Sequence, residues 1–558
     1  MTVNSNVHVP SVVEAERGET RRFDIAILGS RPAGLILGAI LARHGLRTVI
    51  IDSEIHPRYQ CGEDTIPFSS LIFEMIADRY DVPQIRNIAR ARDVRDTVMP
   101  SSGIKKNLGF LYHSEGKTQD PSQALQFNVP SEHGESHLYR QDVDAYLLHA
   151  AVEHGVVYLQ RKSNGSIEFG ETDVRLQNSY GDWIEAEFVI DAAGEDSPIA
   201  QMLGLRTDAQ RFVTHTTRFA THMIGVAPYD DTFPRRFPEK WHNGTLHHVF
   251  DGGWIGVMPF NNVSYSTNST TSVVIHLQGE HGGRDGDQVL ADLAARFPSL
   301  REHLGLARRV REWEVASPAQ YGCIKPLGSR YLLLDESAYG NDLLFSRKLS
   351  NTAELVFALG HRLIAAARKR DYQGSELTGF AELQQGVVDF GDRIIAAAYV
   401  AMSDPALWNA FARSWLLFSI TSTISCKHPY DNFVRSGDVA AFAPLDMASA
   451  DGIWMPLDTS YRTLFTRVLK ACETVRTGGQ STEAATKEIF VALAQSRALL
   501  PPIFDFGDPN VQVYNLTMAR KIKTLIWGLT TARGGVGKLI FYRNFKKKAN
   551  RPAPTPAK

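Results

Sequence analysis

The sequence has few cysteines, no long apolar run and almost no net charge. Its four cysteines are widely spaced and form neither a zinc motif nor a disulfide framework, which fits a reducing, cytoplasmic location. No stretch approaches the roughly 18 apolar residues of a membrane helix, and the N-terminus lacks the apolar core of a signal peptide. Sixty basic against 61 acidic residues leave no field that would attract nucleic acid. His247 and His248 have no further ligands in register, so no metal site is expected. These absences favour a globular protein that acts on a small molecule.

The first clear pattern is a dinucleotide-binding unit of the α/β class. An apolar strand at 23–30, a helix of small and aliphatic residues at 31–45 and a second strand at 46–52 follow one another. A strand, tight turn, helix and strand within about 30 residues open a doubly wound, Rossmann-like sheet. Its three turn positions hold Gly29, Arg31 and Gly34. Arg31 stands where the backbone normally approaches a pyrophosphate, and it either pairs with a phosphate or obstructs the site.

Acidic Asp52 ends the second strand, where it is placed to accept hydrogen bonds from ribose hydroxyls. The alternative is a plain turn aspartate. The pattern predicts a dinucleotide-binding domain formed by residues 22–210 and 325–375, interrupted by a polar segment at about 100–135. Strand-like runs at 211–324 predict a substrate-side β-sheet, and residues 376–540 are helical by periodicity. Flexible tails are expected at 1–21 and 541–558, the second basic and rich in proline.

Several segments together resemble the flavin-dependent halogenases, above all the tetracycline-type enzymes of secondary metabolism. The likeness runs from about residue 22 to 530 and is carried, in order, by HPRYQCGEDTIP (56–67), SSGIKKNLGFLYH (101–113), RQDVDAYLLHAAVEHG (140–155), VIDAAGEDSPIAQMLGL (189–205), GTLHHVFDGGWIGVMPFNN (244–262) and LLFSRKLSNTAELV (343–356). The resemblance implies an FAD-binding fold with an added substrate-side sheet and a helical C-terminal region.

The resemblance also implies a chemistry. FAD, reduced by a separate flavin reductase, reacts with oxygen and with chloride or bromide, and the resulting hypohalous acid travels to a lysine beside the substrate. Lys105 matches that lysine, and Lys106 takes its place if the register slips by one. Glu63 matches a glutamate of a turn near the flavin. Asp64 replaces the usual serine of that turn and adds a carboxylate that would discourage a nearby anion.

Other positions correspond to cofactor contacts of the family. Arg140 and Asp142 match residues that contact the FAD phosphates, although a helix cap with a salt bridge would use the same residues. Asp191 and Gly194 match the second nucleotide-binding strand and its turn. Asp342 belongs to a second nucleotide motif that has lost its proline.

The substrate side departs from the family in the Trp-x-Trp-x-Ile-Pro signature. Trp254 and Pro259 are kept, but the second tryptophan is Gly256, which opens volume beside the tunnel. A plain core role for Trp254 is the alternative. Phe345 stands where indole halogenases have a glutamate, so a phenol or polyketide is a better substrate than tryptophan.

The halide turn departs as well. It reads Ser346, Arg347, Lys348, with lysine in place of the glycine whose backbone holds the halide. Arg347 and Lys348 are therefore the candidate halide residues. Lys348 either attracts chloride by its charge or fills the site.

Three functions follow. The first is an FAD-dependent halogenase acting on an electron-rich aromatic or polyketide substrate, free or tethered to a carrier. The second is a repurposed homologue that binds FAD weakly or not at all and acts as a cofactor-free cyclase, isomerase or auxiliary protein. The third is an FAD monooxygenase, which the loss of the second tryptophan favours.

Overall fold

The computed structural model describes most of the chain, namely residues 21–131, 134–160, 164–178, 183–207, 211–233, 237–447, 451–455, 458–496 and 498–532. The tails expected at 1–21 and 541–558 therefore lie outside these ranges, except for residue 21, with which the first strand begins. No helix within these ranges is long and apolar enough to cross a membrane.

The first sheet is the expected α/β sheet, with the strand order β7-β2-β1-β10-β9-β8 and β19 beside β10. Its parallel strands are β1 (Arg21–Leu28), β2 (Thr48–Asp52), β7 (Val157–Gln160), β10 (Trp183–Asp191) and β19 (Tyr331–Leu333). The antiparallel strands are β8 (Asn164–Phe169) and β9 (Val174–Asn178). Because β1, β2, β10 and β19 run in one direction, their carboxyl ends meet at one edge, where ligands of such sheets bind.

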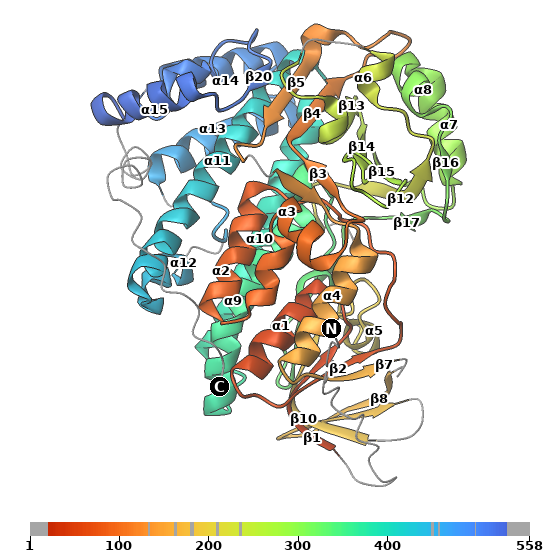
Figure 1. The fold of residues 1–558 in the computed structure, drawn as a ribbon, viewed down its shortest axis with the longest axis vertical. Coiled ribbons are helices and arrows are strands. Elements are labelled where there is room, and N and C mark those ends of the chain that lie inside the picture. Colours follow the sequence, from red (N-terminus) through yellow and green to blue (C-terminus); the bar gives the residue numbers. More distant parts are fainter. Residues whose placement is uncertain are drawn as a thin grey trace, which may run out of the picture.

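Helices cover this sheet and form the main core with it. The lower half of Figure 1 shows α1 and α4 side by side, with α9 and α2 beyond them. Their bounds are α1 (Pro32–Arg43), α2 (Pro67–Arg79), α4 (Arg140–Glu153) and α9 (Arg347–Lys369). Small and aliphatic side chains allow α1 to be buried along almost its whole length, as the sequence predicts.

The second sheet has the strand order β16-β12-β15-β14-β13-β4-β5-β20, with β17 also paired to β12. Its strands are β4 (Asn107–Tyr112), β5 (Ala124–Asn128), β12 (Thr216–Ile224), β13 (Thr245–Phe250), β14 (Gly253–Pro259), β15 (Thr271–Gln278), β16 (Arg308–Arg309), β17 (Glu314–Ala316) and β20 (Val513–Tyr514). Two helices, α7 (Gly286–Arg296) and α8 (Pro298–Leu304), pack apolar side chains against one face of it.

The polar segment at 100–135 is the main correction to the sequence reading. It contains three strands, and a fourth begins at its last residue. β3 (Gly103–Lys105) and β6 (Glu135–His137) pair with each other, while β4 and β5 extend the second sheet. All six residues of β4 are buried. The polar residues on either side made β4 difficult to predict, because so short a strand is stabilised by its pairing with distant strands.

The C-terminal region is helical, apart from the short strand β20 that joins the second sheet. Its helices are α10 (Ser375–Met402), α11 (Pro405–Ser436), α12 (Ala443–Asp446), α13 (Thr459–Arg476), α14 (Thr482–Gln495) and α15 (Met518–Thr530). In Figure 1, α11 to α15 lie on the left and α10 lies near the centre, and α10 and α11 pack against helices of the first domain. Short connections include α3 (Ala91–Asp93), α5 (Pro198–Met202), α6 (Tyr229–Thr232), β11 (Arg206–Thr207) and β18 (Gly322–Cys323).

Candidate functional site

The turn between β1 and α1 has the backbone of a dinucleotide site. Gly29 has φ 87°, and a Cβ there would overlap the backbone of Ala193 in the neighbouring turn. A Cβ on Gly34 would meet the Gly29 carbonyl oxygen at 2.7 Å. Both positions therefore require glycine, and the helix terminus behind them can attract an anion.

Arg31, the middle residue of this turn, is largely buried and crosses the edge of the sheet. Its guanidinium lies against Gly194, whose φ is 90°, so closely that a Cβ on Gly194 would overlap it. Its Nη1 is 3.1 Å from Oε2 of Glu336. Arg31 is thus held by a carboxylate of the chain itself.

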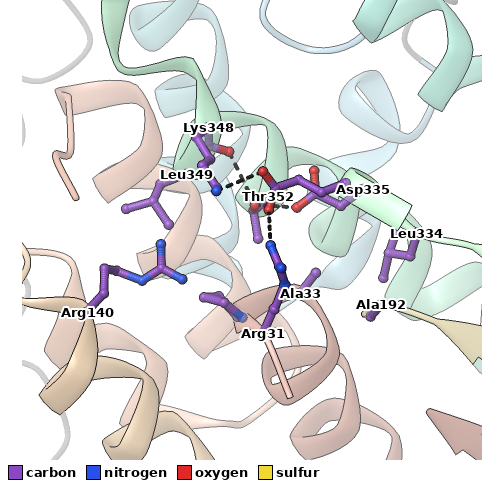
Figure 2. Close-up of a pocket in the computed structure, with 11 residues that line it drawn as sticks. Arg31, Ala33, Arg140, Ala192, Leu334, Asp335, Lys348, Leu349 and Thr352 are labelled. Atoms are coloured by element: carbon purple, nitrogen blue, oxygen red, sulfur yellow. Dashed lines mark hydrogen bonds and ion pairs between the residues drawn. The ribbon is translucent and has the colours of Figure 1, made fainter. Parts of the chain in front are cut away.

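The same carboxylate binds a second cation, Lys348, at the start of α9. Nζ of Lys348 is 2.8 Å from Oε1 of Glu336, and its methylene groups cover Gly62. Glu336 therefore connects Lys348 to Arg31, and these two side chains line one cavity (Figure 2). The cavity is lined by Arg31, Pro32, Ala33, Arg140, Ala192, Leu334, Asp335, Glu336, Lys348, Leu349 and Thr352.

The pKa values of the two carboxyl groups of this cavity, Asp335 and Glu336, are shifted in opposite directions. Burial and then the charge of Glu336 raise the pKa of Asp335 to about 7. Burial also opposes the ionisation of Glu336, but Lys348 and Arg31 together lower its pKa to about 2. Glu336 is therefore the permanent anion between the two cations, while Asp335 is a hydrogen-bond partner of Thr352.

Asp52 lies at the end of β2, where the sequence places it, but its oxygens are engaged. The Ser30 amide donates to Oδ2 at 2.6 Å, and the Arg58 guanidinium lies 2.9 Å from the same oxygen. Oδ1 accepts from the amide of Glu54 and from Arg58. A ribose at this strand end would have to displace or share the Arg58 contact.

Arg140 lines the cavity from α4 and is held rigidly. It donates through Nε and Nη2 to Asp144 at 2.7 and 2.8 Å, and through Nη1 to the Gly62 carbonyl at 2.9 Å. Arg140 thus forms a salt bridge, but its partner is Asp144 and not Asp142. Asp142 accepts a hydrogen bond from Ser101 instead.

Asp191 and Asp342 are centres of buried hydrogen-bond networks. Asp191 accepts from the amides of Ala193 and Ile199, and it therefore shapes the turn that contains Gly194. Asp342 binds three aromatic side chains and one amide, namely Trp254, His276, Tyr399 and the Leu344 N–H. Both aspartates position their loops in this structure.

Lys105 ends β3 and is completely buried. Its Nζ donates to Oδ2 of Asp64 at 2.6 Å and to Oγ of Ser346 at 2.9 Å. Burial lowers the pKa of Lys105, and Asp64 opposes that shift. Burial would raise the pKa of Asp64, but Lys105 above all lowers it to about 2. Asp64, which was expected to repel anions, is thus the ion-pair partner of Lys105.

Glu63 and Lys106, the sequence neighbours of Asp64 and Lys105, do not take part in this ion pair. Glu63 is buried beside His222, whose Nε2 is 2.8 Å from its Oε1, so Glu63 and Asp64 contact different strands. Lys106 is half-buried and follows the end of β3. Lys105 is therefore the lysine that joins the site.

A second cavity is lined by residues of both charge clusters. Gly62 and Lys348 belong to the first cluster, and Asp64 and Ser346 contact Lys105. Its remaining walls are Thr245, His247, Trp254, Gly256, Met258, Val274 and Leu343. Gly256 lines this space, and a Cβ there would meet the ring of Trp254 at 3.0 Å. Pro259 ends β14, and its carbonyl accepts a hydrogen bond from His137 at 2.9 Å.

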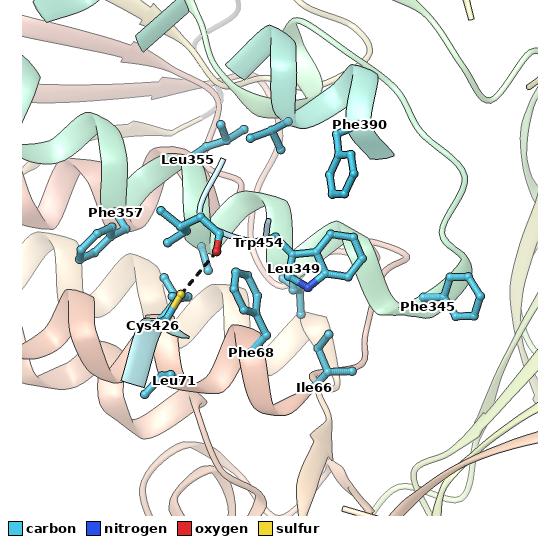
Figure 3. Packing of buried hydrophobic residues seen from close by; sticks show 14 of the residues in the cluster. Ile66, Phe68, Leu71, Phe345, Leu349, Leu355, Phe357, Phe390, Cys426 and Trp454 are labelled. Atoms are coloured by element: carbon cyan, nitrogen blue, oxygen red, sulfur yellow. Dashed lines mark hydrogen bonds between the residues drawn. The ribbon is translucent and has the colours of Figure 1, made fainter. Parts of the chain in front are cut away.

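An aromatic cluster lies beyond Ser346. Phe345 and Ser346 have φ values of 65° and 60°, a left-handed conformation that side chains rarely adopt. This turn stacks Phe345 on Trp415 of α11, with ring centroids 4.2 Å apart, and parallel to Trp408 at 6.3 Å. Figure 3 draws Phe345 among residues of the main core, in which it is fully buried.

Arg347 does not join Lys348. Its guanidinium lies 3.6 Å from the ring centre of Trp454, where burial lowers its pKa to about 10. Successive residues at the start of α9 point about 100° apart, so only Lys348 faces the cofactor side. The expected halide pair is therefore split between two environments.

The sequence analysis missed Glu336 and Asp335. The signal for these two carboxylates was present, because the run LLLDES places them directly after β19, at the ligand-binding edge of a parallel sheet. Ser346 was named only as the first residue of the halide turn, and its contact with Lys105, 241 residues earlier, had no local signal.

Comparison with known proteins identifies the family. Residues 22–312 match the FAD binding domain family. Tetracycline 7-halogenase of Kitasatospora aureofaciens is 34% identical over 95% of this chain and 97% of its own length. Monodechloroaminopyrrolnitrin halogenase PrnC of Pseudomonas fluorescens is 34% identical over 95% of each chain. The chain belongs to the flavin-dependent halogenases. The crystal structure of halogenase PltM with phloroglucinol and FAD superposes with a TM-score of 0.84 at 28% identity, over 88% of this chain and 100% of that one.

FAD is the cofactor of this family, and the structure tests how well this halogenase fits it. The α1 terminus, Arg31, Arg140 and Lys348 surround the cavity in Figure 2 and supply the positive groups that a pyrophosphate needs. The donor set therefore fits. In this structure, however, Arg31 and Lys348 are already paired with Glu336, so a pyrophosphate would meet two cations that hold a carboxylate of the chain.

Proposed function

We propose that this halogenase chlorinates or brominates an electron-rich aromatic or polyketide substrate, with Lys105 directing hypohalous acid. The placement of Lys105 carries the proposal. It is fully buried, and its partners Asp64 and Ser346 both line the second cavity. Bound FAD, reduced by a separate flavin reductase, would supply hypohalous acid from oxygen and halide.

The contacts of Lys105 suit this role. An ammonium has three N–H donors, and Asp64 and Ser346 accept two of them. The third can donate to the oxygen of hypohalous acid, which makes the halogen more electrophilic. As the aromatic carbon bonds to the halogen, the halogen–oxygen bond breaks and Lys105 protonates the departing hydroxide to water. The proton that leaves the ring then passes to the neutral amine of Lys105 and restores its ammonium. Asp64 stabilises this ammonium as its ion-pair partner.

The aromatic cluster supports an aromatic substrate. The indole N–H groups of Trp408 and Trp415 are buried and have no hydrogen-bond partner among the described residues. Unpaired buried donors are costly, and a phenolic or keto oxygen would satisfy them.

A reductase-coupled assay tests the proposal. Purified protein is given FAD, a flavin reductase, chloride or bromide and phloroglucinol as probe, and the product is analysed by mass spectrometry. Lys105→Ala is expected to abolish the halogenated product while FAD still binds, and Lys106→Ala serves as the matched control that keeps activity. A product heavier by one oxygen and independent of halide would instead support a monooxygenase.

The bridge of Arg31, Glu336 and Lys348 favours a second candidate, the repurposed homologue with little affinity for FAD. It predicts a colourless purified protein that does not take up FAD even at millimolar concentration. The titration of FAD described below separates it from the halogenase.

A further inference from the structure

We infer that Glu336 is an internal competitor for the pyrophosphate of FAD. Its carboxylate holds Arg31 and Lys348 across the cofactor cavity, and FAD binds only when its phosphates replace that carboxylate. The inference rests on the proposed function, because it takes FAD as the ligand. We call the three residues Arg31, Glu336 and Lys348 the Glu336 bridge.

The geometry of the Glu336 bridge is that of an occupied anion site. Each oxygen of the carboxylate binds a different cation, Arg31 at 3.1 Å and Lys348 at 2.8 Å. Both contacts lie beside Pro32 and Ala33, the first residues of α1. A helix terminus and two cations around one anion are the groups that dinucleotide folds offer to phosphate.

The surrounding charges leave Glu336 as the anion that can be exchanged. Arg218 is already paired with Glu314 at 2.6 Å, and Arg140 with Asp144 at 2.7 Å. Arg31 and Lys348 share Glu336, so the bridge itself carries one excess positive charge. A pyrophosphate diester brings two negative charges and would satisfy both cations better than one carboxylate does.

The exchange needs only side-chain movement. Arg31 lies over Gly194 and Lys348 over Gly62, and at both glycines the absence of Cβ provides the room. Arginine and lysine have long flexible stems, so rotation about their side-chain bonds can uncover the cavity while the backbone stays in place. FAD must nevertheless break the two ion pairs, and its affinity is reduced accordingly.

Glu336→Gln tests this inference, because it keeps the shape of the side chain and removes its charge. FAD is titrated into the full-length protein, and binding is followed by the quenching of flavin fluorescence. We expect the Kd of the variant to be roughly tenfold lower than that of the wild type, which corresponds to about 1.4 kcal/mol. Glu185→Gln, which removes a surface carboxylate paired with Arg22, is the matched control and should bind like the wild type.

Inorganic pyrophosphate identifies the part of FAD that competes. It is expected to inhibit FAD binding at lower concentration in Glu336→Gln than in the wild type. Equal FAD affinity of wild type and Glu336→Gln, or weaker binding by the variant, would overturn the inference while leaving the halogenase proposal intact. If neither protein binds FAD although thermal unfolding shows both to be folded, both proposals fail.

Lys348→Gln provides a second test if Glu336→Gln does not fold. The inference requires Lys348 to bind a phosphate after Glu336 releases it, so this variant should bind FAD several-fold more weakly. Tighter binding would mean that Lys348 only obstructs the cavity, and the exchange of anions would be refuted.

Discussion

Replacing Asp64 by asparagine is expected to lower the free energy of unfolding by about 3 to 5 kcal/mol, because it leaves the ammonium of Lys105 buried and unpaired. Lys105 has no solvent exposure, and its two hydrogen-bond partners are Asp64 and Ser346. At the observed 2.6 Å and an effective dielectric constant near 20, the Coulomb attraction is about 6 kcal/mol. Asparagine can still accept a hydrogen bond from Lys105 but carries no charge, so the expected loss in unfolding free energy is smaller than the full Coulomb attraction.

The double variant Asp64→Asn, Lys105→Met supplies the decisive comparison. Methionine fills much of the lysine volume without charge, so the double variant should be more stable than the sum of the single losses predicts, by at least about 2 kcal/mol. Urea unfolding followed by circular dichroism measures all four proteins at one pH. Additive losses, or a cost below about 1 kcal/mol for Asp64→Asn, would refute the claim that these residues form a buried ion pair.

The same pair has a defined pH dependence. The pKa of Asp64 is lowered from 3.8 to about 2 in the folded protein. Since the folded pKa is the lower one, its stabilisation is complete above pH 4 and is lost as the pH falls toward 2. The Asp64→Asn variant should lack this component of the acid unfolding curve.

Three other changes are testable. Burial raises the pKa of Glu135 from 4.5 to about 7, so the free energy of unfolding of the wild type should fall as the pH rises from 4.5 to 7. Glu135→Gln lacks this loss and should gain up to about 3 kcal/mol relative to the wild type over that interval, whereas a constant difference in unfolding free energy would contradict this. Gly194→Ala should lower the thermal midpoint, because its φ of 90° and the contact with Arg31 both oppose a Cβ, and adding Arg31→Gly should recover only part of the loss. Phe345→Gly should be more stable than Phe345→Ala by about 1 kcal/mol in urea unfolding, because the left-handed backbone at φ 65° favours glycine; the opposite order would show that the strain is absent.

The sequence by itself determined the first domain. The features that identify it are local, namely strand and helix periodicity, Gly29 and Gly34, and Asp52 at the end of β2. A dinucleotide-binding sheet requires all of them within one short segment. The strands of the second sheet within 211–324 and the C-terminal helices were predictable from their periodicity, whereas β4 and β5 of that sheet were not. The family resemblance likewise selected Lys105 from a region that composition alone describes as polar.

Only the tertiary structure decided how the charges pair. Arg31 and Glu336 are 305 residues apart, and Lys105 meets Asp64 and Ser346 from separate elements. The strands β3 to β6 also became visible only through their partners, since short strands are stabilised by pairing more than by their own residues. Side-chain contacts depend on which strand ends meet in space, and for that reason the sequence named the cations of the cofactor cavity but not the carboxylate that holds them.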